Sequence, residues 1–140
     1  MENQKRIITI ETSINAPIEK VWESATLSKH IKNWIFASDD WHSPGAENNP
    51  NDGGTFSVKM ASKDGSMNYD YEGKYKSIIT HKKIEYEISE GREVKLLFEE
   101  IDQFINVTLT FNPEIQNPYE LQQNLWQAIL DNFKKYTETL

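Results

Sequence analysis

The chain has 140 residues, a length that fits a single domain, and hydrophobic residues make up 37% of it. Its 15 Lys and Arg face 22 Asp and Glu, so the net charge of −7, without a basic stripe, argues against nucleic-acid binding. The lack of cysteine excludes disulfide scaffolds, thiol catalysis and cysteine-based zinc sites. No stretch approaches the roughly 18 apolar residues of a membrane span, and the N-terminus lacks the apolar region of a signal peptide. These features predict a soluble, cytoplasmic protein.

The first part of the chain predicts one strand and two short helices. Residues 6–14 alternate between apolar and polar side chains, which indicates a strand buried on one face. Apolar residues recur at helical spacing over residues 18–25, so an amphipathic helix is expected there. A second short helix is expected over residues 28–34, with Ser28 as its N-terminal cap.

The middle of the chain predicts a loop followed by a meander of strands. Residues 37–51 hold Pro, Gly and several Asn without sustained periodicity, which is typical of a loop. Five segments of alternating apolar residues follow, and the turns between them are too short for crossover connections, so the strands must be antiparallel. The five predicted strands cover residues 56–60, 69–75, 84–88, 94–98 and 105–111.

The C-terminus predicts one long amphipathic helix over residues 118–139, about 22 residues or roughly 33 Å in length. A helix of that length can cross the whole concave face of a sheet. We therefore predict an α+β fold in one domain, residues 1–140. It is a curved six-stranded antiparallel sheet around the C-terminal helix, with two short helices between the first and second strands. The apolar stripe of the helix contains Leu121, Leu125, Ile129, Phe133 and Tyr136, widened by Trp126 and Leu130.

Three stretches of the sequence carry a family resemblance. The first helix is preceded and begun by INAPIEKVW (14–22), and the last helix contains WQAILDNF (126–133). With the order of the elements, these stretches resemble the START/Bet v-like (SRPBCC) superfamily. The segment WIFASDDWH (34–42), followed by GGTF (53–56), looks like the bacterial AHSA-like family within it, named for homologues of the activator of a heat-shock-protein ATPase. This resemblance implies a helix-grip fold whose cavity, between sheet and long helix, often holds a lipid, sterol or polyketide.

The resemblance also implies which side chains would line such a cavity, because the inward faces of sheet and helix are then both core and lining. From the residues alone, a row of tyrosines on one strand could equally be ordinary core against a helix. The residues predicted to line the cavity are Trp34, Trp41, His42, Phe56, Val58, Met60, Tyr69, Tyr71, Tyr75, Phe98, Trp126, Ile129 and Phe133.

Asp39, Asp40 and His42 form the one cluster that could coordinate a metal or perform acid–base chemistry. Adjacent aspartates point in different directions on most backbones, and a metal site normally brings two or three convergent ligands. A capped turn anchored by Trp41 is therefore favoured over a polar rim of the cavity and over a metal site. We expect no metal and no cofactor.

Fold alone does not assign an activity, because members of the superfamily include carriers, receptors, cyclases and chaperone regulators. The leading hypothesis is non-enzymatic binding of a small hydrophobic molecule. The alternative is a stress-response or chaperone-associated protein-interaction module. An enzyme of the cyclase or hydrolase type is less favoured, since the chain has no G-x-S-x-G motif and would need a polar residue such as His42 or Asp70 buried in the cavity.

Overall fold

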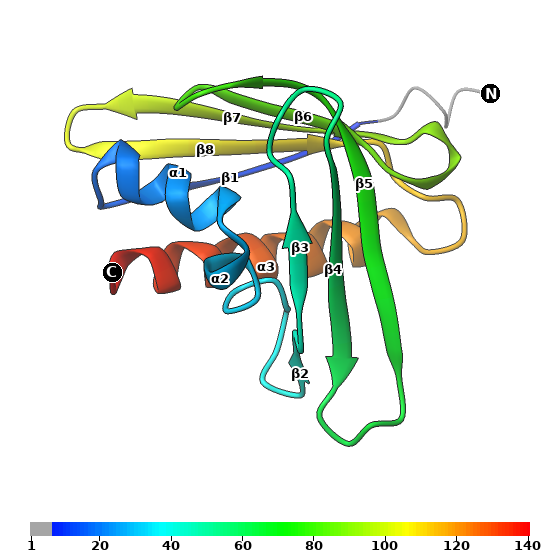
Figure 1. Cartoon of the computed structure of the whole chain (residues 1–140). Helices are drawn as coiled ribbons and strands as arrows, with labels where there is room; N and C mark the ends of the chain where they lie inside the picture. The colour runs from blue at the N-terminus through cyan, green and yellow to red at the C-terminus, as the bar shows by residue number, and fades with distance from the viewer. Residues whose placement is uncertain (1–6) are drawn as a thin grey trace.

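The computed structural model describes residues 7–140, so Arg6, where the first predicted strand begins, lies outside the described residues. The chain forms an antiparallel sheet, two short helices and a long C-terminal helix (Figure 1). The strands are β1 (Ile8–Ile14), β2 (Trp41–His42), β3 (Ala46–Asn48), β4 (Thr55–Ser62), β5 (Asn68–Ile79), β6 (Lys83–Glu87), β7 (Glu93–Ile101) and β8 (Phe104–Phe111). The helices are α1 (Ile18–Thr26), α2 (Ser28–Ile31) and α3 (Tyr119–Glu138), with a 3-10 turn, η2 (Ser89–Gly91).

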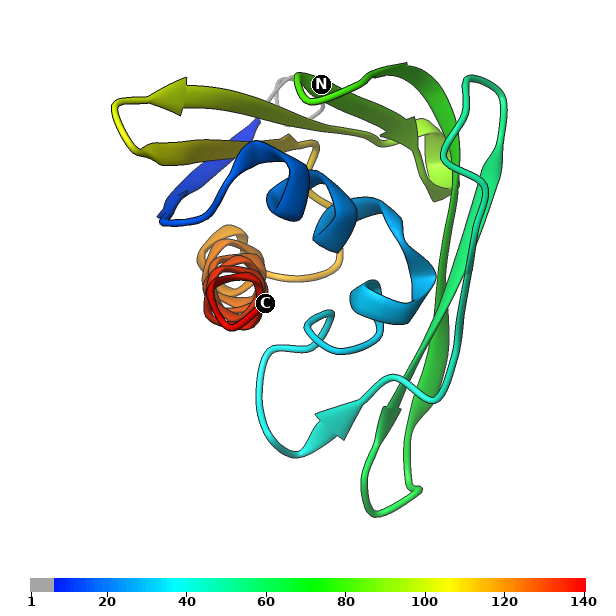
Figure 2. The same ribbon diagram turned by 60° about the vertical axis from the view of Figure 1, so that its left-hand side comes forward.

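Within residues 7–140 the sheet has eight strands in the order β1-β8-β7-β6-β5-β4-β2, and β3 also pairs with β4. Every pairing is antiparallel. The sheet bends, so that β1, β8, β7 and β6 form one side while β5 and β4 turn away from them, with all three helices on the concave side (Figure 2). The predicted α+β helix-grip fold is thereby confirmed.

Strand β1 shows why the periodicity of the sequence was informative. Ile8, Ile10 and Ile14 are at most 4% exposed, whereas Thr9 and Glu11 between them face solvent. Successive side chains of a strand point to opposite faces, so this alternation places one face of β1 in the core. The pairing of β1 with β8 continues that face across the sheet, because Ile8 lies opposite Phe111 and Ile14 opposite Ile105.

Helix α3 lies on the concave side and packs against β1 and α1. Its second half carries most of the buried side chains, with Ile129, Leu130 and Phe133 at most 4% exposed. Leu121 and Leu125 of the predicted apolar stripe are instead 55% and 42% exposed. The packing partners of α3, β1 and α1, therefore cover only part of its length. Over residues 7–140, no helix is long and apolar enough to cross a membrane.

Two details differ from the predicted elements. The segment 37–51 contributes β2 and β3, only two and three residues long, and these account for eight strands in place of six. Both pair with β4, so the neighbouring strand orders them rather than a periodicity of their own. Helix α2 is shorter than the predicted helix over 28–34, and Leu27, not Ser28, occupies its N-cap position without a side-chain hydrogen bond.

Candidate functional site

The concave side of the sheet and helix α3 enclose a cavity of about 560 Å³. Aromatic and aliphatic side chains form most of its lining, with a few polar groups at one end. Pockets of about 300–1,000 Å³ with this kind of lining are typical of sites for small apolar molecules. The aliphatic part of the wall includes Ile84, Val94, Leu96 and Leu109 on the strands and Ile129 and Leu130 on α3.

Five aromatic rings meet along one wall of the cavity. Phe56 lies at the centre, with its ring centroid 4.8 Å from that of Tyr86 and 5.3 Å from that of Tyr75. Tyr71 connects this group to the helix, because its ring lies 5.3 Å from Trp126. Edge and tilted contacts at these distances are favourable for aromatic pairs, so the wall is a cohesive surface.

The position of the Phe56 ring depends on a glycine. Gly73 lies directly opposite Phe56 in the β4–β5 register. A Cβ atom at position 73 would lie 2.6 Å from the Phe56 ring and 2.8 Å from the Glu87 carbonyl oxygen. Only glycine therefore lets the ring cover the backbone of β5 at this place.

The hydroxyl groups of the wall are buried and paired with one another or with an amide. The hydroxyls of Tyr71 and Tyr86 are 2.8 Å apart, and the Tyr75 hydroxyl donates to Asn48 Oδ1 at 2.5 Å. Burial raises the pKa of Tyr75 to about 12 and raises the pKa values of Tyr71 and Tyr86 as well. These phenols stay neutral at ordinary pH, so they offer hydrogen bonds rather than a base.

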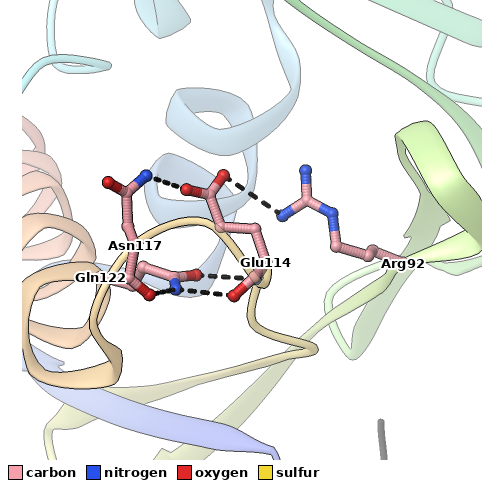
Figure 3. A network of polar contacts seen from close by, with 4 residues as sticks. All are labelled: Arg92, Glu114, Asn117 and Gln122. Carbon is pink, nitrogen blue, oxygen red and sulfur yellow. Dashed lines mark hydrogen bonds and ion pairs between the residues drawn. The ribbon is translucent and has the colours of Figure 1, made fainter. Parts of the chain in front are cut away.

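One end of the cavity carries a polar cluster built on the β8–α3 connection (Figure 3). The Gln122 side chain, 6% exposed on α3, accepts a hydrogen bond from the Glu114 backbone N–H at 2.9 Å. It donates to the carbonyl oxygens of Glu114 and Asn117 at 3.0 and 2.9 Å. The Asn117 side-chain amide in turn donates to Glu114 Oε1. Together these bonds fix the connection to the first turns of the helix.

Arg92 faces this cluster from the other side of the cavity end (Figure 3). Its Nη1 lies 4.0 Å from Glu114 Oε2. Val94 pairs with Phe111 at the end of the β7–β8 ladder, so the residues just beyond the two strands come together. The Arg92 Nε is buried and has no hydrogen-bond partner within residues 7–140.

The lining also includes partly exposed apolar side chains, which form an apolar rim. Leu121 and Leu125 on α3 and Tyr69 on β5 line the cavity and are 42–55% exposed. The Trp41 ring packs against Tyr69, with centroids 5.8 Å apart. The cavity is therefore open to solvent along an apolar edge.

Most of the side chains predicted to line a cavity surround this one, although their role in binding stays a prediction. They come from β4, β5 and α3, and Trp34 comes from the segment that follows α2. The predicted residues that line the cavity are Trp34, Phe56, Val58, Tyr69, Tyr71, Tyr75, Trp126, Ile129 and Phe133.

The structure places the other four predicted residues outside the wall. His42 on β2 is exposed, and Trp41 beside it reaches the rim only through Tyr69. Met60 is buried in the core near the far end of β4. Phe98 is also buried, but it packs against Trp22 of α1, with ring centroids 5.2 Å apart, and does not line the cavity.

The sequence did not single out the polar end of the cavity. Arg92, Glu114, Asn117 and Gln122 were not predicted, and neither was Tyr86 as a wall residue. One signal was available, because Arg92 is one of only two arginines in the chain and follows directly on the Glu90-Gly91 turn. The contact with Glu114 depends on the strand register, which the sequence did not show.

The Asp39-Asp40 segment forms an exposed turn in which the Trp41 N–H donates to the Ser38 carbonyl oxygen at 3.1 Å. Across residues 7–140, no three His, Asp or Glu side chains are grouped so that they could hold a metal ion. Asp70 lines the cavity but is exposed. The acid–base hypothesis for His42 or Asp70 required burial in the cavity, and neither side chain has it.

Comparisons with known proteins agree with this architecture. The sequence profile of the family described as Activator of Hsp90 ATPase homolog 1-like protein matches residues 15–138. A search of curated proteins gave no match.

Solved structures extend the likeness over nearly the whole chain. A solution structure of a protein from Cytophaga hutchinsonii is 46% identical, with a TM-score of 0.82, and the match covers 98% of this chain and 93% of that one. The AHSA1-like protein from Aeromonas hydrophila is 36% identical, with a TM-score of 0.90 and coverage of 96% and 93%. The Aha1 dimer from Colwellia psychrerythraea, at 18% identity, TM-score 0.70 and coverage of 95% and 96%, shares the fold alone.

Proposed function

The chain belongs to the AHSA1-like family of the SRPBCC/Bet v-like superfamily, and we propose that it binds a small hydrophobic molecule between the sheet and α3. The observation that carries this proposal is the cavity of about 560 Å³ with its aromatic wall and open apolar rim. Close packing is the rule in protein interiors, and voids larger than a water molecule are few. An apolar space of this size is suited to a ligand.

The polar groups of the wall support binding without a reaction. Tyr71, Tyr75 and Tyr86 already have hydrogen-bond partners, and their raised pKa values keep the phenols protonated. A general base needs a pKa near the working pH, which none of these groups has. The wall therefore suits a carrier or sensor of an apolar compound.

A ligand panel tests the proposal. We expect at least one member of a set containing decanoate, 1-decanol, a sterol and an aromatic polyketide to shift the fluorescence of Trp126 and the amide resonances of the wall. Leu96→Trp should fill the space, so the affinity for the ligand should fall roughly tenfold or more, that is by at least about 1.4 kcal/mol. Leu96 lines the cavity, whereas its neighbour Leu97 is 40% exposed and is not a lining residue.

Leu97→Trp is therefore the matched control, and its affinity should equal that of the unchanged protein. If binding were unchanged in Leu96→Trp, the ligand would have to bind at another place on the protein. A panel without any binder would contradict the proposal.

Contact with a heat-shock chaperone is the second candidate. The family description names an ATPase activator, and exposed apolar side chains near the cavity end, Ile115 at 86% and Leu121 at 55%, favour a protein contact. Stimulation of an Hsp90-type ATPase by this protein, together with a panel that gives no binder, would favour this candidate over ligand binding.

A further inference from the structure

The polar end of the cavity holds one guanidinium whose hydrogen-bonding capacity is largely unused. Arg92 Nε is buried without a partner among residues 7–140, and the side chain as a whole is 22% exposed. A buried donor left unpaired destabilises the folded protein, more so when it belongs to a charged group. Such a group calls for an acceptor that the described chain does not supply.

Glu114 does not satisfy this requirement. Its Oε2 lies 4.0 Å from Arg92 Nη1, beyond the range of a hydrogen bond, and on a different nitrogen from the unpaired Nε. Its other oxygen accepts from the Asn117 amide, and its backbone is bonded to Gln122. The β8–α3 connection therefore holds Glu114 in place, and no acceptor among residues 7–140 bonds to Arg92 Nε.

We infer that the ligand is an apolar carboxylic acid, with its hydrocarbon part in the cavity and its carboxylate on Arg92. The Nε–H and an Nη–H of a guanidinium point in parallel and match the two oxygens of a carboxylate. The aromatic and aliphatic wall next to Arg92 suits the hydrocarbon part. This inference rests on the proposed function and adds the chemical class of the ligand.

The other charged side chains that line the cavity are acidic, so they would disfavour a negatively charged ligand. Asp70, Glu72 and Glu114 also line the cavity, and Arg92 is its only lining cation within residues 7–140. Without a direct partner, a carboxylate would be repelled by these acidic side chains. Preference for an acid over a neutral analogue must therefore come from Arg92 alone, and its removal should reverse the preference.

The experiment compares decanoate, 1-decanol and methyl decanoate by calorimetry at pH 7.5 on the full chain. We expect decanoate to bind roughly tenfold more tightly than the alcohol and the ester, since hydrogen bonds to charged groups are strong. In Arg92→Gln the order should invert, with the affinity for 1-decanol unchanged. Lys95→Gln is the matched control, because it removes one positive charge from β7 between the wall residues Val94 and Leu96 without being a lining residue.

Three results would overturn the inference. Equal affinities for decanoate and 1-decanol in the unchanged protein would mean that no carboxylate site exists, while ligand binding itself would stand. An equal loss for acid and alcohol in Arg92→Gln would make Arg92 a structural residue. Failure of all three compounds would also overturn it, and the proposed function falls too only if the whole panel fails. If Arg92→Gln does not fold, the affinities of the unchanged protein for decanoate, methyl decanoate and 1-decanol decide whether a carboxylate site exists.

Discussion

The two halves of helix α3 differ in what covers them. In the second half, Phe133 is 1% exposed and the Thr137 hydroxyl donates to Ser24 Oγ at 2.8 Å, so the helix is fixed to α1 and the sheet. In the first half, Leu121 and Leu125 line the open cavity and remain 42–55% exposed. One helix thus has a half that holds the fold together and a half that leaves room beneath it. Both halves line the cavity, so substitutions in the two halves should differ mainly in how much stability they cost.

The largest expected effect comes from removing a large side chain in the closed half. Phe133→Ala should lower the free energy of unfolding by roughly 3–5 kcal/mol, because a fully buried ring is lost and a void remains. Leu125→Ala in the open half should change it by less than about 1 kcal/mol, since that side chain is 42% exposed. Urea denaturation of both variants measures the contrast. Similar losses at the two positions would contradict the division of the helix.

This contrast shows where sequence reasoning succeeds and where it stops. The spacing of Leu121, Leu125, Ile129 and Phe133 correctly indicated a helix with these side chains along one stripe. Spacing tells which residues share a face, but the bend of the sheet decides what lies opposite that face. The spacing therefore did not show that the first half of the stripe lines an opening.

The polar end of the cavity escaped prediction for a related reason. Arg92 precedes β7 and Glu114 follows β8, so only the register that pairs Val94 with Phe111 brings them together. The aromatic wall was easier to predict, because Tyr71 and Tyr75 share a parity on one strand. Local periodicity thus indicated the apolar wall, whereas the polar groups depend on long-range pairing.

The aromatic wall of the cavity should be sensitive to substitution of one glycine, Gly73 on β5. Gly73→Ala is expected to destabilise the protein by about 1–3 kcal/mol, because the new methyl group would meet the Phe56 ring and the Glu87 carbonyl. The displaced ring should also weaken binding of any ligand in the cavity. Thermal and urea unfolding measure the first effect.

Gly45→Ala provides the control for this substitution. A Cβ atom at position 45 has no atom within 4 Å, so the change should be neutral or stabilise the protein by up to about 1 kcal/mol. If Gly73→Ala were equally harmless, the Phe56 ring would be able to move aside without loss of stability. The aromatic wall would then be less rigid than the buried second half of α3.

The smallest effect is expected at the tip of the β4–β5 hairpin, far from the closed half of α3. Hydrogen bonds from the Ser66 hydroxyl and backbone N–H, and then from the Ser62 hydroxyl, lower the pKa of Asp64 from 3.8 to about 2. A carboxyl group whose pKa is lower in the folded state than in the unfolded state stabilises the fold at pH values above the unfolded-state pKa. This contribution should be present above about pH 4 and lost as the pH falls toward 2.

An NMR pH titration measures this directly. The Ser66 amide resonance should move with an apparent pKa near 2, and Asp64→Asn should abolish that movement while leaving the rest of the spectrum in place. A transition near 3.8 would mean that the turn is not closed around the carboxylate. The tip of the β4–β5 hairpin would then be loose in solution, and Ser62 and Ser66 would not hold the carboxylate as the hydrogen bonds indicate.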